Sequence, residues 1–133
     1  MDDVQAKGIW AMGALVKAHP ENKIQAGDGG GCEAVCDALR MYTGSEGLQQ
    51  VGLWCIGSLA ANNGENAGKV GRAGGIVLVI NAMRNFLSPE MQEMGCWALA
   101  NMAASNSKCA EYIEKKEGPQ AIISAMKLHP KNP

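Results

Sequence analysis

Residues 52–63 read GLWCIGSLAANN and residues 95–106 read GCWALANMAASN, so the chain contains nearly the same phrase twice. A third version, GIWAMGALVKAH, occupies residues 8–19. The chain has three tryptophans, and they hold the same place in the three phrases, 44 and 43 residues apart. A glycine stands two residues before each tryptophan. This spacing is typical of a repeat protein.

A second marker keeps the same period: DALR begins at residue 37, NAMR at residue 81 and SAMK at residue 124. Two independent markers with one period predict an internal structural repeat. Alanine, leucine, methionine, glutamine and glutamate dominate the longer segments, while β-branched and aromatic residues are sparse and no alternation of period two persists. The repeating units are therefore predicted to be helical.

Each unit is predicted to hold a short, a medium and a long helix. In one unit NAGKVGRA is closed by two glycines, IVLVINAMRNF gives about three turns, and a long helix opens at Ser88-Pro89 with serine as N-cap and proline in the first turn. The predicted organisation is one domain over residues 1–133. It comprises the long helix of a partial unit (3–18), two complete units (21–62 and 64–105) and the first two helices of another (107–128).

The composition excludes several classes of protein. The chain carries 13 acidic and 12 basic residues, so no charge excess favours nucleic acid or an anionic membrane. The longest apolar run, residues 76–80, is far shorter than the roughly 20 residues that span a bilayer, and no signal-peptide pattern opens the chain. We expect a cytoplasmic protein without membrane insertion, with the nucleus as an alternative. The five cysteines lie mostly within apolar helical patterns, which favours reduced, buried thiols.

The three-helix unit of about 42 residues, the Gly-Gly pair between its first two helices and the third helix GCWALANMA resemble the armadillo repeat family, of the importin-alpha, beta-catenin and vacuolar armadillo protein type. The resemblance covers nearly the whole chain. It implies an all-α fold, a right-handed α-solenoid with three helices per repeat. HEAT repeats, with two helices in a similar length, are the nearest structural alternative.

The tryptophans do not belong to the main apolar stripe of the long helices. At 100° per residue, one arc of each helix is apolar and is expected to form the core: Met91, Gly95, Ala98, Leu99 and Met102 in one unit, and Leu48, Gly52, Cys55, Ile56 and Leu59 in the other. Trp54 and Trp97 project roughly opposite this arc. In a solenoid this side lines a concave surface, where spaced indoles leave slots for long side chains. The alternative is that each tryptophan packs against the neighbouring long helix.

Armadillo proteins that hold extended peptides use a tryptophan followed four residues later by asparagine. Trp97 and Asn101 match this pattern, whereas Ser58 and Ala14 stand at the asparagine position in the other units. A carboxamide can pair with both the N–H and the C=O of a peptide backbone. The resemblance makes Trp97 and Asn101 candidate peptide-binding residues, with Trp54, Ser58 and Trp10 at equivalent places in the other units. Glu93 and Gln50 join them because they lie beside the tryptophans on the same helical face.

Glutamates near these helices indicate which peptides fit. Glu90 and Glu93 lie on the same arc as Trp97, and Glu46 precedes Trp54, so a ligand carrying lysine or arginine would meet complementary charge. Equally, glutamate near a helix N-terminus is favourable with the helix dipole alone. Two functions stay open: a non-catalytic scaffold for a protein or extended peptide, and a structural segment of a longer solenoid with packed tryptophans.

None of the remaining motifs favours a phosphate-binding, metal-binding or catalytic site. AGDGGGC at residues 26–32 lacks the lysine and hydroxyl residue of a phosphate-binding loop. Cys32 and Cys36 share a helical face, yet no other ligand lies near them and Cys32 aligns with Ile76, so both are expected in the core rather than on zinc. No nucleophile, base and carboxylate set appears near His19 or His129. We therefore expect no enzyme activity, no cofactor and no metal.

The two ends of the predicted array carry apolar residues without polar caps. The residues expected to expose core faces are Val4, Ile9, Met12 and Leu15 at one end and Ile122, Ile123 and Met126 at the other. Solenoids need polar terminal surfaces for solubility. The sequence therefore predicts either a fragment of a longer array or self-association through these ends.

Overall fold

The computed structural model describes residues 3–131, and these residues form α-helices with no strand among them. The helices are α1 (Asp3–Ala18), α2 (Pro20–Asp28), α3 (Gly31–Met41), α4 (Glu46–Ala60), α5 (Gly64–Arg72), α6 (Gly75–Asn85), α7 (Pro89–Ser105), α8 (Ser107–Lys115) and α9 (Gly118–Leu128). The prediction of an all-α chain is confirmed. α2 begins at Pro20, one residue before the segment 21–62 outlined from the sequence, and the other helices lie within the outlined segments.

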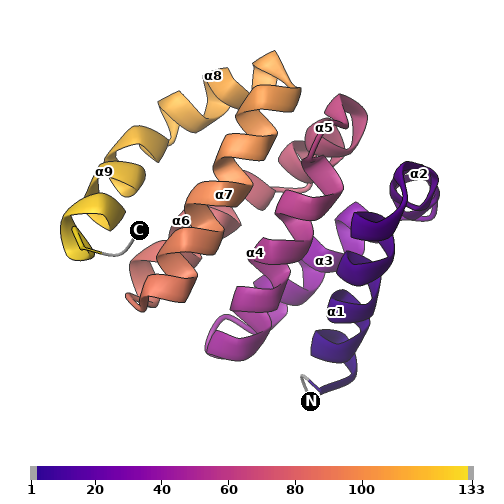
Figure 1. The fold of residues 1–133 in the computed structure, drawn as a ribbon, viewed down its shortest axis with the longest axis horizontal. Helices are drawn as coiled ribbons and strands as arrows, with labels where there is room; N and C mark the ends of the chain where they lie inside the picture. The colour runs from indigo at the N-terminus through magenta and orange to yellow at the C-terminus, as the bar shows by residue number, and fades with distance from the viewer. Residues whose placement is uncertain (1–2, 132–133) are drawn as a thin grey trace.

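Helices one period apart lie side by side and form three rows (Figure 1). The long helices α1, α4 and α7 make one row, α2, α5 and α8 a second, and α3, α6 and α9 a third. The long-helix row is the most closely packed of the three. A residue in one unit therefore meets the equivalent region of the next unit, and contacts in one junction can be compared with those in the other.

The helix boundaries follow from local chemistry. The Ser88 Oγ accepts a hydrogen bond from the Met91 N–H at 3.3 Å, and Pro89 occupies the first turn of α7, as predicted. Between the first and second helices of each unit the backbone turns through a left-handed residue: Gly30 at φ 87°, Gly74 at φ 86° and Glu117 at φ 66°. The repeat thus keeps its turn geometry even where the glycine is replaced.

One hydrophobic core runs through all units. The predicted arcs of α4 and α7 are buried in full. Four cysteines are buried and Cys96 is half-buried, and all five are free thiols. Burial raises the pKa of Cys36 and of Cys55 to about 12. These two thiols therefore stay protonated and unreactive at neutral pH.

Two buried glutamines each join a medium helix to the long helix that follows it: Gln49 joins α3 to α4, and Gln92 joins α6 to α7. The Gln92 Nε2 donates to the carbonyls of Met83 and Phe86, at 2.7 and 2.9 Å. Gln49 does the same at the end of α3, with both distances 2.9 Å. The last carbonyls of a helix have no partner inside the helix. These amides satisfy them within the core.

Four of the seven apolar residues predicted to be exposed at the ends of the array are exposed: Val4, Leu15, Ile123 and Met126. Met12 and Ile122 are half-buried against the core. The expectation for Ile9 was wrong: it is only 4% exposed, because it lies in the core cluster on the inner side of α1. Among residues 3–131 no helix has the length and hydropathy needed to cross a membrane.

Candidate functional site

The three tryptophans lie along the long-helix row, and we call the surface they share the tryptophan face. The indoles of Trp54 and Trp97 each pack on a glycine of the preceding long helix. A Cβ atom added at Gly13 would fall within 3.0 Å of the Trp54 ring, and one added at Gly57 within 3.0 Å of the Trp97 ring. The missing side chains at these glycines therefore let each indole lie directly against the neighbouring helix.

A tryptophan of this face can pack against a helix and still be partly exposed to solvent. Trp54 is half-buried and Trp97 is 37% exposed although both contact the preceding helix. Trp10 is 60% exposed, since the described part of the chain places no helix on the side of α1 away from α4. The two alternatives drawn from the sequence are thus not exclusive: the rings of Trp54 and Trp97 each pack on the preceding long helix and stay partly exposed.

A hollow of about 340 Å³ opens between α1, α4 and α7, and we call it the tryptophan hollow. Its lining residues are Trp10, Gly47, Gln50, Val51, Trp54 and Met94. Three of the predicted site residues, Trp10, Gln50 and Trp54, are brought together here. The lining carries no charged side chain, and the Gln50 amide has no hydrogen bond to any residue between 3 and 131. The hollow therefore offers two indoles and one unpaired carboxamide.

The predicted site residues of α7, which are Glu93, Trp97 and Asn101, do not line this hollow. Glu93 borders a smaller hollow of about 150 Å³ between α7 and α9, together with Cys96 and His129. Trp97 and Asn101 border neither. The Asn101 Nδ2 donates to the Gly57 carbonyl at 3.0 Å, and its Oδ1 accepts nothing from residues 3–131. Asn101 thus ties α7 to α4 while keeping one acceptor open.

The assignment of Ser58 as a peptide-binding residue is corrected by its surroundings. Ser58 is 4% exposed, and its hydroxyl donates to the Trp54 carbonyl one turn back at 2.9 Å. Four residues along a helix turn 400°, so Ser58 is rotated by about 40° from Trp54, toward the buried side. The short serine side chain stays beneath the surface, while Asn101 at the equivalent place is longer and half-buried.

Reasoning from the sequence did not predict that Gly13 and Gly57 receive the indoles, and it missed three residues of the hollow, namely Gly47, Val51 and Met94. A signal for the first was present: Gly13 and Gly57 each follow a tryptophan by three residues. The equivalent residue after Trp97 is Ala100, which is exposed. No comparable repeat marks the residues of the hollow, since Val51 and Met94 are equivalent to each other but enter it from different sides.

Within residues 3–131 no group of three or more histidine, cysteine, aspartate or glutamate side chains is arranged to hold a metal ion. Comparison of the chain with protein-family models, with curated proteins and with solved structures found no match. The resemblance to armadillo repeats therefore depends on the residues of this chain alone.

Proposed function

We propose that the chain is an α-solenoid of armadillo repeats, a right-handed superhelix with three helices per repeat, whose tryptophan face binds an extended peptide or an extended segment of a partner protein. The protein acts as a scaffold without catalysis. The observation that carries this proposal is the tryptophan hollow, where Trp10, Gln50 and Trp54 converge from two helices on an uncharged space of about 340 Å³.

The chemistry of the hollow favours a polypeptide ligand. Partly exposed indoles supply large contact areas at low entropic cost, and tryptophan is enriched among residues that dominate binding energy. The free Gln50 amide can donate to a carbonyl and accept from an N–H of an extended backbone. Because the hollow is uncharged, we expect an apolar side chain or an aliphatic stem within it. Glu93, on the α7 side, then suits a lysine or arginine further along the same peptide.

The test begins with selection of random octapeptides by phage display on the 133-residue chain, followed by fluorescence polarisation of the selected peptides. We expect Trp10→Ala to weaken binding by at least about tenfold, the range of a central aromatic contact. Since Trp10 is largely exposed, the same change should leave the melting temperature within about 2 °C of the wild type. Gln50→Ala should weaken binding less, by a few-fold.

The matched control is Tyr112→Ala, which removes an exposed aromatic side chain from α8, in another helix row. It should leave peptide affinity unchanged. If Trp10→Ala and Tyr112→Ala affect the selected peptides equally, or if selection yields no peptide at all, the tryptophan face is not a peptide site.

A second candidate function is that of a structural segment that associates through its ends. It is favoured by the exposed apolar residues at the two ends of the rows: Val4, Trp10 and Leu15 on α1, and Ile123 and Met126 on α9. Exposed apolar patches mark association sites. This alternative is developed below at the scale of the whole molecule.

A further inference from the structure

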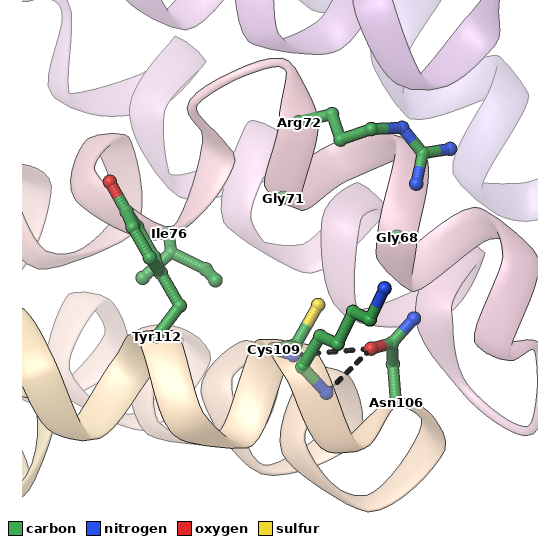
Figure 2. A pocket seen from close by; sticks show the side chains of 8 residues that line it. Gly68, Gly71, Arg72, Ile76, Asn106, Cys109 and Tyr112 are labelled. Carbon is green, nitrogen blue, oxygen red and sulfur yellow. Dashed lines mark hydrogen bonds between the residues drawn. The ribbon is translucent and has the colours of Figure 1, made fainter.

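A gap of about 450 Å³ lies between α5 and α8, in a different helix row from the tryptophan face (Figure 2). We call it the α5–α8 gap. Its lining residues are Gly68, Gly71, Arg72, Ile76, Asn106, Lys108, Cys109 and Tyr112. None of them belongs to α1, α4 or α7. The volume falls within the range of small-molecule sites, roughly 300 to 1,000 Å³.

The equivalent space one unit earlier, between α2 and α5, is bridged by a lysine. The Lys69 Nζ donates to the Gly27 carbonyl at 3.1 Å and lies 3.6 Å from the Asp28 carboxylate. Its side chain is only 20% exposed. A single lysine of α5 thus spans the junction and pairs with an acid at the end of α2.

The repeat places different residues at these positions in the next junction. Tyr112 stands where Lys69 stood, and Arg72 stands where Asp28 stood. Glycine at position 68 also replaces an isoleucine, Ile24. An aromatic ring cannot make the ion pair, and a cation now occupies the place of the acid. The gap therefore stays open, with two glycines rather than side chains on its α5 wall.

The two cations of the gap have no acidic partner. Neither Arg72 nor Lys108 forms an ion pair with any residue that the structure describes. Asn106 is already engaged: its Nδ2 donates to the Gly64 carbonyl at 2.9 Å, and its Oδ1 accepts from the Lys108 and Cys109 N–H groups at 3.0 and 3.1 Å. The free polar groups of the lining are thus mainly cationic.

The rest of the lining is apolar. Figure 2 shows the Tyr112 ring and Ile76 toward one end of the gap and the Arg72 guanidinium toward the other. Ile76 is buried, and the Cys109 thiol donates to the Ala67 carbonyl at 3.3 Å, so neither adds charge. The gap therefore combines an apolar end with a cationic end.

We propose that the α5–α8 gap binds a small apolar carboxylic acid, with its carboxylate at Arg72 and Lys108 and its hydrocarbon body against Ile76 and Tyr112. Guanidinium and carboxylate form the strongest hydrogen-bonded ion pairs available to side chains. The apolar body supplies the contact area that a bare anion lacks. The amide or ester of the same acid keeps the body and loses the charge, and it binds more weakly.

The probe is 3-phenylpropionate, titrated into the 15N-labelled chain while the backbone amide signals are followed by NMR. We expect saturable shifts at Gly68, Gly71, Lys108 and Tyr112. The uncharged analogue 3-phenylpropanamide should bind more weakly, by up to about fivefold, because a partly exposed charge pair contributes up to about that ratio. Equal affinities for acid and amide, shifts at other residues, or no saturation up to about 20 mM, the weak end of measurable affinity, would overturn the proposal.

Two variants locate the site. Arg72→Gln keeps the shape and removes the charge, and it should weaken binding of the acid several-fold. Arg72→Asp combined with Tyr112→Lys rebuilds the pair that Lys69 makes with Asp28, so it should close the gap and abolish binding. The matched control Arg84→Gln removes an exposed arginine of α6 that pairs with Glu117, and binding should persist.

Circular dichroism of each variant shows whether the helices are retained, and Arg72→Gln alters only an exposed side chain. If the rebuilt lysine and aspartate pair leaves binding unchanged, or if an acidic octapeptide without aromatic residues binds more tightly than 3-phenylpropionate, the gap is not a site for small apolar acids. None of these outcomes bears on the peptide proposal, because the two sites share no residue.

Discussion

At the scale of single residues, the repeat distinguishes positions that hold the fold from positions that face solvent. Gln5, Gln49 and Gln92 are spaced by the same 44 and 43 residues as the tryptophans. Gln49 and Gln92 are buried and satisfy the carbonyls that end α3 and α6. Gln5 is exposed, because the described chain has no helix end beside it. The same residue type at one register position thus has two energetic roles.

This difference gives a matched pair of variants. Gln92→Leu leaves a buried carbonyl (Met83) and a partly buried one (Phe86) without this donor, and we expect it to lower the free energy of unfolding by about 2–4 kcal/mol. Gln5→Leu removes no hydrogen bond found between residues 3 and 131 and should change the free energy of unfolding by less than about 0.5 kcal/mol. Urea denaturation followed by circular dichroism measures both. Equal effects from the two changes would contradict the role given to Gln92.

Whether a residue is buried or exposed could be predicted where the helical period alone decides it. The buried arcs of α4 and α7 followed from 100° per residue, and so did the partial exposure of Trp54 and Trp97. Ser58 was misplaced because a carry-over by position ignored side-chain length: a serine at the edge of the arc is covered, while an asparagine reaches the surface. Side-chain reach and neighbouring helices decide such edge positions, and neither is readable from one helix alone.

At the scale of helices, glycines set how closely the rows approach. Gly57 receives the indole of Trp97, while Gly8 in the interior of α1 has open space where a Cβ would be. Gly57→Ala would force the indole away, and we expect it to lower the free energy of unfolding by about 1–3 kcal/mol. Gly8→Ala adds helix propensity without a clash, so this change should raise the free energy of unfolding by up to about 1 kcal/mol.

Urea denaturation measures this pair as well, and the emission spectrum of the native state adds an independent readout. Displacing the Trp97 ring from Gly57 should shift tryptophan emission to longer wavelength, whereas Gly8→Ala should leave it unchanged. If alanine is tolerated at position 57 as well as at position 8, the indole does not depend on a bare helix surface.

Helix boundaries were predictable because the chain marks them with strong local signals. Ser88-Pro89 opens α7, and the Gly74-Gly75 pair separates α5 from α6, as the residues predicted. The open α5–α8 gap was not predicted, because it depends on which residue of one helix meets which residue of the next. Aligning Lys69 with Tyr112 and Asp28 with Arg72 would have revealed the lost ion pair, but not the volume that results.

At the scale of the whole molecule, each unit contacts only its neighbours, and the two ends of the long-helix row are unlike. On α1, Trp10 is exposed and lacks a glycine-bearing helix to pack on. On α7, the position equivalent to Gly13 and Gly57 is Ala100. A second copy stacked head to tail in the same geometry would bring Trp10 onto Ala100. The alanine Cβ would then occupy the space that both internal junctions keep empty.

Association through the ends, the second candidate function, therefore has a specific test. Ala100→Gly restores the bare helix surface on α7, and we expect it to tighten head-to-tail association of the chain by about tenfold relative to the wild type, the gain from relieving one over-packed contact. Trp10→Ala in the Ala100→Gly background should abolish that gain.

Sedimentation equilibrium over about a hundredfold range of protein concentration measures the association constants, because mass action makes the degree of association depend on concentration. A head-to-tail contact leaves the same two surfaces free on each growing array, so the strengthened variant should form a series of oligomers rather than a single dimer. A monomer throughout for both variants, or an association that ignores Trp10, would leave the exposed apolar ends without a role in self-assembly.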